Sequence, residues 1–384
     1  MRVVVLTAGF GEGHNAAACN LAAAFDAALA PGAAQVADIF ALASPRLNAV
    51  SRRGYLALIN RAPRLWQAIY GWLDRSQFPG RSLRLLRGET KRLAELVARE
   101  QPVAVCSTYP VYAFMFARLA RAGRLAVPHF NIVTDSISIN SIWWRVPCDG
   151  WFVPNADSAD VLLRAGVAAA RVHALGFPTP AFIAGHAHLA PPELALGGRP
   201  RVLCIINSVT RDAAALVRPL LTETDWEITV AVGRDDRLRR RLEKLATGRS
   251  APAQVLGWTD QIPHLLLTHH LVVSKAGGAT TQEAVAARCP MIVSQIVPGQ
   301  EEGNYELLRR HGAGVLAETP AAILAACRHV FAGDGRVWSE RRAALAKLSR
   351  PHAARDIAAY VLASVGPAGR VTELAARESG AISL

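Results

Sequence analysis

The residues best suited to chemistry in this chain follow a short apolar run, Leu271–Val273. The run predicts a buried strand, and the turn Ser274–Gly278 after it ends in two adjacent glycines. A helix is predicted next, with Thr280 and Thr281 capping it and Glu283 in its first turn. The free N–H groups and the positive dipole end of such a helix face the turn. The segment therefore predicts a binding site for an anion such as a phosphate.

Polar side chains near this turn suit the rest of a nucleotide-sugar. The Glu283 carboxylate is placed to accept hydrogen bonds from the paired hydroxyls of a ribose, as an acidic residue does in other nucleotide-binding folds. Pro290–Ile296 predicts the next strand, and Gln300, Glu301 and Asn304 gather where it gives way to another helix. Amides and a carboxylate together suit sugar hydroxyls. For the Gly pair alone, an ordinary strand–turn–helix with glycines for packing is the alternative.

A second candidate site lies near the N-terminus. Arg2–Thr7 predicts a buried strand, residues 8–15 form a glycine-rich turn, and residues 16–29 predict an Ala-rich helix. His14 lies at the junction of turn and helix, above the strand ends, where open α/β sheets bind ligands. Histidine has an ordinary pKa of about 6.5, so it accepts a proton at neutral pH. His14 is a candidate general base, with structural capping of the helix as the alternative.

The stretch Leu271–Gly314 resembles the donor-site signature of glycosyltransferase family 28, which contains the diacylglycerol glycosyltransferases. In that family the glycine-rich turn and its helix hold the diphosphate of the donor, the glutamate holds the ribose, and a Gln-Glu-x-x-Asn group holds the sugar. The resemblance assigns these roles to Gly277, Gly278, Thr280 and Thr281, then to Glu283, and then to Gln300, Glu301 and Asn304.

The Gly-x-Gly-His string that ends at His14 resembles the N-terminal signature of the same family, in which the histidine faces the acceptor. Asp135 follows a predicted strand on the ligand side, where it is expected to orient His14 or to contact the acceptor hydroxyl, or else to cap a helix. In the similar enzymes a His commonly precedes the next Trp, whereas this chain has Asn140. The segments that match the N-terminal domain of diacylglycerol glycosyltransferases are Thr134–Pro154, with Trp143 or Trp144 and Asp149, and Gly176–Pro178.

Two sets of alternating strands and helices are predicted to position these residues, which indicates an α/β fold with parallel sheets. The resemblance implies the GT-B architecture, in which two Rossmann-like domains face each other across a cleft. We expect an N-terminal domain at 1–185, a linker at 186–200 and a nucleotide-sugar domain at 201–335. Terminal helices at 336–365 are expected to cross back to the N-terminal domain, before a tail at 366–384.

Three further donor contacts are expected in the second domain. Ser208 follows its first predicted strand and is a candidate for the diphosphate. The segment Gly257–Ile262 lines the base in the family, so Ile262 is the candidate for meeting uracil. Lys275, together with the helix end, is expected to hold the departing diphosphate.

The net charge of +13 is concentrated in one part of the chain. Between Arg46 and Arg99 there are twelve Lys or Arg and three Asp or Glu, interleaved with aromatic residues at helical spacing. Rings and cations together suit a membrane interface with anionic lipid, and a basic, solvated face over core residues is the alternative. The residues expected at the acceptor or the membrane are Arg52, Arg53, Tyr55, Trp66, Tyr70 and Trp72.

Length and composition restrict the remaining possibilities. A chain of 384 residues with 51% hydrophobic content is too long to fold around one compact core, so two domains are expected. Its six cysteines have no metal-site spacing, which indicates a reducing compartment. We find neither a signal peptide nor an apolar run of about 20 residues, so we expect a cytoplasmic protein. There is no Asp-x-Asp motif for a divalent ion, and we expect no metal and no cofactor.

Together these observations predict an inverting transfer of hexose from UDP-glucose or UDP-galactose to a lipid hydroxyl. The resemblance implies diacylglycerol as acceptor, at the cytoplasmic face of a membrane, with His14 as the base. A UDP-sugar epimerase or hydrolase of the same fold is one alternative. A basic nucleic-acid-binding protein is another, although no recognisable nucleic-acid-binding motif is present.

Overall fold

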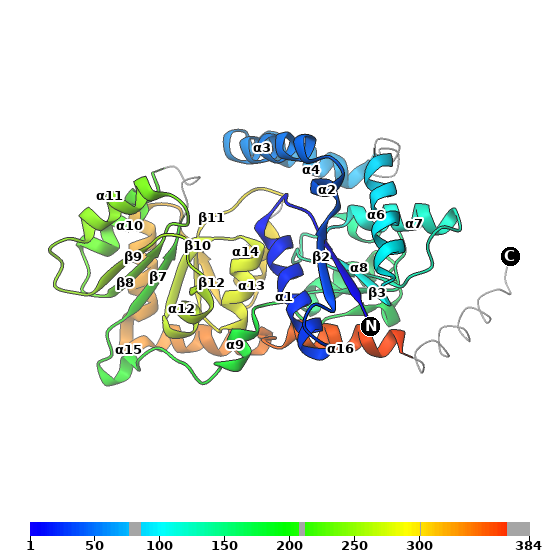
Figure 1. The fold of residues 1–384 in the computed structure, drawn as a ribbon. Coiled ribbons are helices and arrows are strands. Elements are labelled where there is room, and N and C mark those ends of the chain that lie inside the picture. Colours follow the sequence, from blue (N-terminus) through cyan, green and yellow to red (C-terminus); the bar gives the residue numbers. More distant parts are fainter. Residues whose placement is uncertain (77–85, 207–211, 300, 367–384) are drawn as a thin grey trace.

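The computed structural model describes residues 1–76, 86–206, 212–299 and 301–366. The chain forms two six-stranded parallel sheets that lie side by side, one from each half of the sequence (Figure 1). The first sheet has the order β2-β1-β3-β4-β5-β6 and the second has the order β12-β11-β10-β7-β8-β9. The strands are β1 Val3–Thr7, β2 Ala34–Asp38, β3 Ala104–Ser107, β4 His129–Ile132, β5 Gly150–Phe152, β6 Val172–His173, β7 Arg201–Ile205, β8 Glu227–Ala231, β9 Ala253–Leu256, β10 Leu271–Lys275, β11 Met291–Gln295 and β12 Gly314–Leu316.

Helices cover both faces of each sheet, which explains why the strands are apolar runs rather than alternating patterns. In β1, Val4 and Leu6 pack in one core cluster while Val3 and Val5 pack in the cluster on the opposite face, and all four are fully buried. The helices of the first half are α1 Glu12–Ala28, α2 Ile39–Ala43, α3 Pro45–Arg61, α4 Pro63–Arg75, α6 Arg87–Glu100, α7 Val111–Arg121, α8 Ala156–Arg164 and α9 Ala181–Gly185, with short 3₁₀ turns at Ser141–Trp143, Ala169–Arg171 and Leu194–Leu196.

The second half repeats this architecture and ends with two helices that run beneath both sheets (Figure 1). The last helix packs against α1, and its apolar residues join the core cluster beneath β1. Before it, α15 contains a non-helical kink at residues 332–335. The helices are α10 Ala213–Thr222, α11 Asp236–Ala246, α12 Ile262–Thr268, α13 Gly278–Ala286, α14 Glu302–Arg310, α15 Pro320–Leu348 and α16 Ala353–Val365.

Each sheet has one point where its strand order reverses, between β1 and β3 in the first sheet and between β7 and β10 in the second. Connections from the two adjacent strands leave in opposite directions there, and the space between them is where open α/β sheets bind ligands. The predicted base follows β1 and the predicted diphosphate turn follows β10. Strand order therefore places both at ligand-binding positions.

Candidate functional site

His14 is the third residue of α1, which begins at Glu12 rather than at the predicted residue 16. Its Nδ1 lies 3.0 Å from the hydroxyl of Thr134, beyond the end of β4, and its ring meets the Tyr109 ring edge-on with centroids 5.3 Å apart. The surrounding protein excludes water and lowers the pKa of His14 to about 4, against a smaller opposing effect of the Thr108 backbone. His14 is therefore neutral at pH 7, with a lone pair available to accept a proton.

Asp135 does not orient His14, contrary to one of the roles predicted for it. Its Oδ2 accepts a hydrogen bond from Nε1 of Trp143 at 2.8 Å, and the neighbouring Thr134 contacts the imidazole instead. Burial raises the pKa of Asp135 to about 6, although the Trp143 hydrogen bond favours the charged form. Successive residues beyond the strand point in different directions, so only one of the two reaches His14.

Asn140, which stands where similar enzymes carry a histidine, has a structural role. Its side chain is buried and caps the 3₁₀ turn Ser141–Trp143 by accepting a hydrogen bond from the Ile142 N–H at 3.1 Å. Its amide nitrogen donates to the Tyr70 carbonyl at 3.3 Å. Both ends of the amide are engaged in hydrogen bonds, so Asn140 connects the 3₁₀ turn to α4. It supplies no second proton-transfer group.

The glycine turn after β10 leads into α13, but the predicted threonine caps are wrong. Gly277 is the N-cap residue and Gly278 is the first helical residue, with no side-chain cap. Thr280 and Thr281 therefore lie within the first turn of the helix. Thr281 is fully buried with its hydroxyl 3.9 Å from Sδ of Met291, whereas Thr280 is partly exposed. The chain turns helical directly after Gly277, which leaves the first backbone N–H groups of α13 for a ligand.

Glu283 lies in the second turn of α13, one turn later than predicted. Within the described part of the chain its carboxylate has no hydrogen bond or ion pair, and burial raises its pKa to about 7. Glu283 is partly exposed, and a carboxyl group that the surrounding protein desolvates without supplying a hydrogen bond is costly. Two hydroxyl donors from a ligand would satisfy it, which agrees with the expected ribose contact.

Lys275 and Glu301 form an ion pair with each other. The second carboxylate oxygen of Glu301 accepts the Val297 N–H at 3.0 Å, so this buried side chain is already engaged at both oxygens. Asn304 donates to the Ala276 carbonyl at 3.0 Å, while its buried Oδ1 has no partner. Of the predicted sugar-binding residues in the described chain, Asn304 is the one with an unsatisfied polar atom.

Three other predicted donor residues are less informative. Ser208 and Gln300 lie outside the described residues. Ile262 begins α12 and is partly buried against the core cluster that also contains Leu265 and Leu266. Its contact with a base stays a prediction.

The two halves meet directly at the predicted site. A Cβ at Gly278 would lie 3.4 Å from the Thr134 carbonyl oxygen, and a Cβ at Gly13 would lie 3.7 Å from the Ala279 nitrogen. Next to these contacts, Gln282 of α13 donates to the Ser136 hydroxyl at 2.8 Å. The start of α1, the residues after β4 and the start of α13 therefore lie in contact, and Thr134 is next to both His14 and Gly278.

Rings from α3 and α4 extend the His14 side of the site. Tyr55 packs edge-on against Phe10 and Trp66, with ring centroids 6.1 and 5.1 Å away, and Tyr70 lies tilted against Trp66 at 5.8 Å. The Trp66 indole N–H is buried and has no hydrogen-bond acceptor among the described residues. Tyr55, Trp66 and Tyr70 are thus each partly buried among neighbouring rings, and their predicted position at the acceptor or the membrane stays a prediction.

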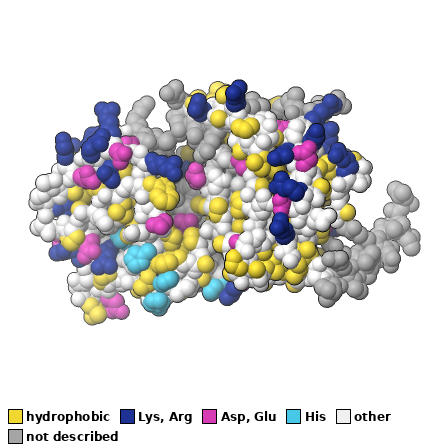
Figure 2. All heavy atoms as spheres, in the orientation of Figure 1, with side chains coloured by type: hydrophobic (Ala, Val, Ile, Leu, Met, Phe, Trp, Pro, Cys, Tyr) yellow, Lys and Arg dark blue, Asp and Glu magenta, His cyan; other side chains and the backbone are white. Residues whose placement is uncertain are grey.

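The outward face of α3 and α4 carries two other residues of the predicted set, Trp72, which is 51% exposed, and Arg53, which is also exposed. Leu65, which is not in that set, is 55% exposed on the same helices. The side chain of Arg52 lies outside the described residues. Figure 2 shows hydrophobic, Lys and Arg side chains along the upper edge of the molecule, where Figure 1 places these helices. Apolar and cationic groups are therefore mixed on this face.

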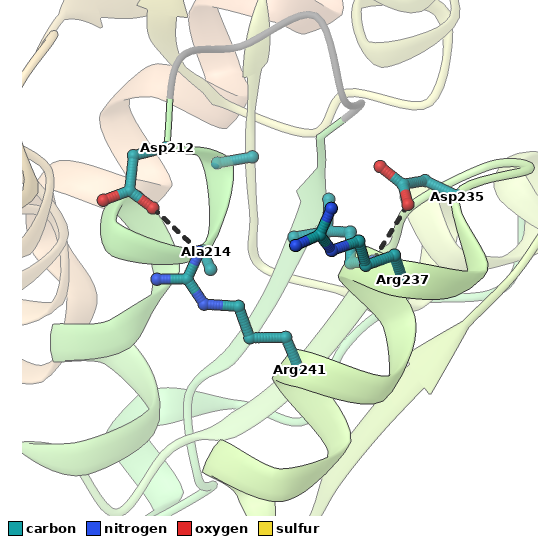
Figure 3. Close-up of a pocket in the computed structure, with 7 residues that line it drawn as sticks. Asp212, Ala214, Asp235, Arg237 and Arg241 are labelled. Atoms are coloured by element: carbon teal, nitrogen blue, oxygen red, sulfur yellow. Dashed lines mark hydrogen bonds and ion pairs between the residues drawn. The ribbon is translucent and has the colours of Figure 1, made fainter.

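A separate pocket of about 450 Å³ lies where α10 and α11 begin, beyond β7 and β8 (Figure 3). Arg241 pairs with Asp212 at 3.2 Å, and Asp235 accepts the Leu238 N–H at 2.9 Å as the cap of α11. The two carboxylates that line the pocket, those of Asp212 and Asp235, are thus already engaged. Its lining includes none of the predicted donor residues that the structure describes.

Several residues of the site are missed by sequence reasoning. Tyr109 follows β3, and its position at the strand reversal is the one signal that would have found it. Ser136 and Gln282 lie far apart in sequence, and nothing in either segment indicates their hydrogen bond. Thr134 carries a signal, because it follows a predicted strand, but its side-chain direction is not readable from the sequence.

Comparisons with known proteins agree with this geometry. Residues 14–179 match the family model for monogalactosyldiacylglycerol (MGDG) synthase. A processive diacylglycerol beta-glucosyltransferase of Bacillus cytotoxicus is 25% identical over 366 residues, covering 94% of this chain and 93% of that protein.

Solved structures share the fold at low identity. Os79 from O. sativa in complex with UDP has a TM-score of 0.62 at 14% identity, covering 95% of this chain and 100% of that one. UDP-GlcNAc 2-epimerase from Neisseria meningitidis has a TM-score of 0.58 at 11% identity, covering 95% and 100%. The predicted GT-B fold is confirmed. The sequence matches also confirm the predicted resemblance to glycosyltransferase family 28, and in particular to the MGDG synthases and processive diacylglycerol glucosyltransferases.

Proposed function

We propose that this protein transfers a hexose from UDP-glucose or UDP-galactose to a hydroxyl of diacylglycerol, with inversion and without a metal ion. The observation that carries the proposal is that the neutral imidazole of His14 lies close to the start of α13, near polar atoms that have no partner among the described residues. On the donor side these atoms belong to Glu283 and Asn304. On the side of the predicted acceptor, the Trp66 indole N–H also has no hydrogen-bond partner among the described residues.

These groups support a single displacement. The acceptor hydroxyl gives its proton to His14 while its oxygen forms the new bond to the anomeric carbon. The bond between that carbon and the UDP oxygen breaks, and its electron pair leaves with UDP. The backbone N–H groups at the start of α13, with Lys275 nearby, stabilise the charge that develops on the diphosphate. One displacement on the face opposite the leaving group inverts the anomeric configuration.

The test is incubation of the protein with radiolabelled UDP-glucose or UDP-galactose and vesicles containing diacylglycerol, followed by lipid extraction. Label in a neutral glycolipid is the expected result, and it identifies donor, acceptor and reaction together. Consumption of the UDP-sugar without added lipid, and no labelled lipid in its presence, would instead identify the epimerase or hydrolase of the same fold. Addition of a metal chelator is expected to leave the transfer rate unchanged.

Donor affinity is expected to depend on pH through Glu283. The ribose contact requires the ionised carboxylate, whose pKa is raised to about 7. As pH falls through this value the carboxyl is protonated, so the affinity for the UDP-sugar should fall by up to about tenfold per pH unit. Above about pH 7 the affinity should be constant. Glu283→Gln should bind about 10- to 100-fold more weakly at high pH, because hydrogen bonds to a charged group are lost, and should show little pH dependence.

Calorimetry with the UDP-sugar itself measures this effect, since its doubly esterified diphosphate does not titrate near neutrality. Glu318→Gln, an exposed glutamate outside the site, is the matched control and should behave as the wild type. The same pH dependence in Glu283→Gln as in the wild type would contradict the ribose role.

We further propose that the outward face of α3 and α4 binds an anionic membrane surface. Trp72→Ala removes a ring that is 51% exposed, and it should weaken binding to vesicles with anionic lipid by about tenfold, from the apolar area that no longer enters the interface. Co-sedimentation with anionic and with neutral vesicles measures this binding. Trp258→Ala, which removes a 68% exposed ring from the second half, is the control. Equal losses in the two variants would count against this face.

No helix in the described ranges of the chain has the length and apolar character needed to cross a membrane.

A further inference from the structure

The His14 imidazole is held by a neutral hydroxyl group. Its Nδ1 lies 3.0 Å from Oγ1 of Thr134, a side chain that is only 4% exposed. An imidazole that takes a proton through Nε2 must already carry its proton on Nδ1, so Nδ1–H has to donate to a neighbouring acceptor. The Thr134 oxygen is at the distance for that bond.

In the part of the chain that the structure describes, no carboxylate is hydrogen-bonded to the imidazole. The adjacent Asp135 carboxylate accepts from Trp143 Nε1 at 2.8 Å. The rings near the imidazole are Tyr109 and Trp143, with centroids 5.3 and 6.4 Å away. The groups described around the imidazole are therefore the Thr134 hydroxyl, two aromatic rings and the Thr108 backbone, and desolvation lowers the pKa of His14 to about 4.

We propose that Thr134, in place of an acidic residue, is the positioning residue of His14: its hydroxyl fixes the tautomer and aims Nε2 at the acceptor. The catalytic part of this inference rests on the transfer reaction proposed above. The proton passes from the acceptor hydroxyl to Nε2, Nδ1 keeps its own proton on Thr134, and His14 later releases the acquired proton to water.

The same residue connects the base with the donor helix. The Thr134 carbonyl faces Gly278, the first residue of α13, and two residues later the Ser136 hydroxyl accepts from Gln282 of the same helix at 2.8 Å. Thr134 thus contacts both His14 and α13, and Ser136 contacts α13. The short segment 134–136 therefore connects the base to the helix that is proposed to bind the donor.

Kinetics of three variants test the proposal. Thr134→Val keeps the shape and removes the hydroxyl, so kcat should fall by about 10- to 100-fold, because the imidazole loses its fixed tautomer and orientation. UDP affinity and the KM for the UDP-sugar should stay within about threefold. Thr134→Ser should recover most of kcat. Thr229→Val is the matched control, because Thr229 is also buried and its hydroxyl lies 2.9 Å from Nε2 of His269, outside the site.

Two kinetic outcomes would overturn the proposal. One is a kcat for Thr134→Val equal to that of Thr229→Val. The other is a greater loss of kcat in Asp135→Asn than in Thr134→Val, which would return the positioning role to the carboxylate.

A second measurement does not depend on turnover. In ¹⁵N-histidine-labelled protein, the His14 signals are identified by their absence in His14→Gln. The wild type should show the Nδ1–H tautomer, and Thr134→Val should show a mixture of both. An Nε2–H tautomer in the wild type would refute the inference. The expected tautomer without any glycolipid product would instead count against the proposed function alone.

Discussion

Replacing His14 with alanine is expected to lower kcat for glycolipid formation by about 10²- to 10⁴-fold, the usual contribution of a general base. The imidazole is neutral at pH 7 because burial lowers its pKa to about 4. At saturating UDP-sugar, the kcat of the wild type should therefore stay constant from neutral pH down to about pH 5, and fall only where the imidazole becomes protonated. A base with an unshifted pKa would already lose activity at about pH 6.5.

The same variant should bind UDP nearly as well as the wild type, since Gly277, Gly278 and Glu283 lie on the other half of the chain. Radiolabelled transfer measures kcat, and calorimetry measures the dissociation constant of UDP. His188→Ala, which removes an exposed histidine from the predicted linker at 186–200, should leave both kcat and the dissociation constant of UDP unchanged. Equal losses of UDP affinity in His14→Ala and Glu283→Ala would refute the division between base and donor site.

Gly303→Ala is expected to lower transfer by about 100-fold or more through geometry alone. Gly303 lies in the first turn of α14, where an added Cβ would stand 1.7 Å from the Ser136 carbonyl oxygen and 2.5 Å from the Ser138 nitrogen. Both neighbours are backbone atoms of the other half, so the two halves must separate to make room. A displacement of about 1 Å between reacting groups is enough to cost about 10²-fold in rate.

Separation of the two halves is distinguished from other causes by measuring the transfer rate and the affinity for UDP in the same variant. UDP affinity should change by less than about threefold in Gly303→Ala, because the clash does not alter the start of α13. Gly185→Ala is the control, since a Cβ at Gly185 meets nothing within 4 Å. Normal transfer in Gly303→Ala would show that the contact between α14 and residues 136–138 is not needed for catalysis. A parallel loss of UDP binding would indicate misfolding of the second half.

Local sequence was sufficient to locate the elements of the site. Apolar runs at residues 2–7 and 271–275 form buried strands because parallel sheets cover both faces of such strands. The turns after them carry His14 and Gly277–Gly278 at the strand ends, and both follow strands at a reversal of strand order. The family resemblance rests on these same strings.

Local sequence was less successful with side-chain direction. The predicted caps Thr280 and Thr281 lie inside α13, and Glu283 lies one turn deeper than predicted, because the helix begins directly after Gly277. The spacing of Tyr55, Trp66 and Tyr70 indicated amphipathic helices, and this spacing cannot tell which neighbours the apolar face meets. Tyr55 packs against Phe10 and Trp66 packs against Tyr55, whereas Trp72 stays on the outside.

The sequence by itself determined that this chain builds two strand–turn–helix elements, with His14 on the first and the Gly277–Gly278 turn on the second, because strand period and turn chemistry are local properties. Only the tertiary structure decided how the two sites meet. Thr134 rather than Asp135 reaches His14, Lys275 pairs with Glu301, and Gly303 admits the backbone of residues 136–138. These contacts join residues distant in sequence, and their geometry depends on how the two sheets pack, which no local pattern specifies.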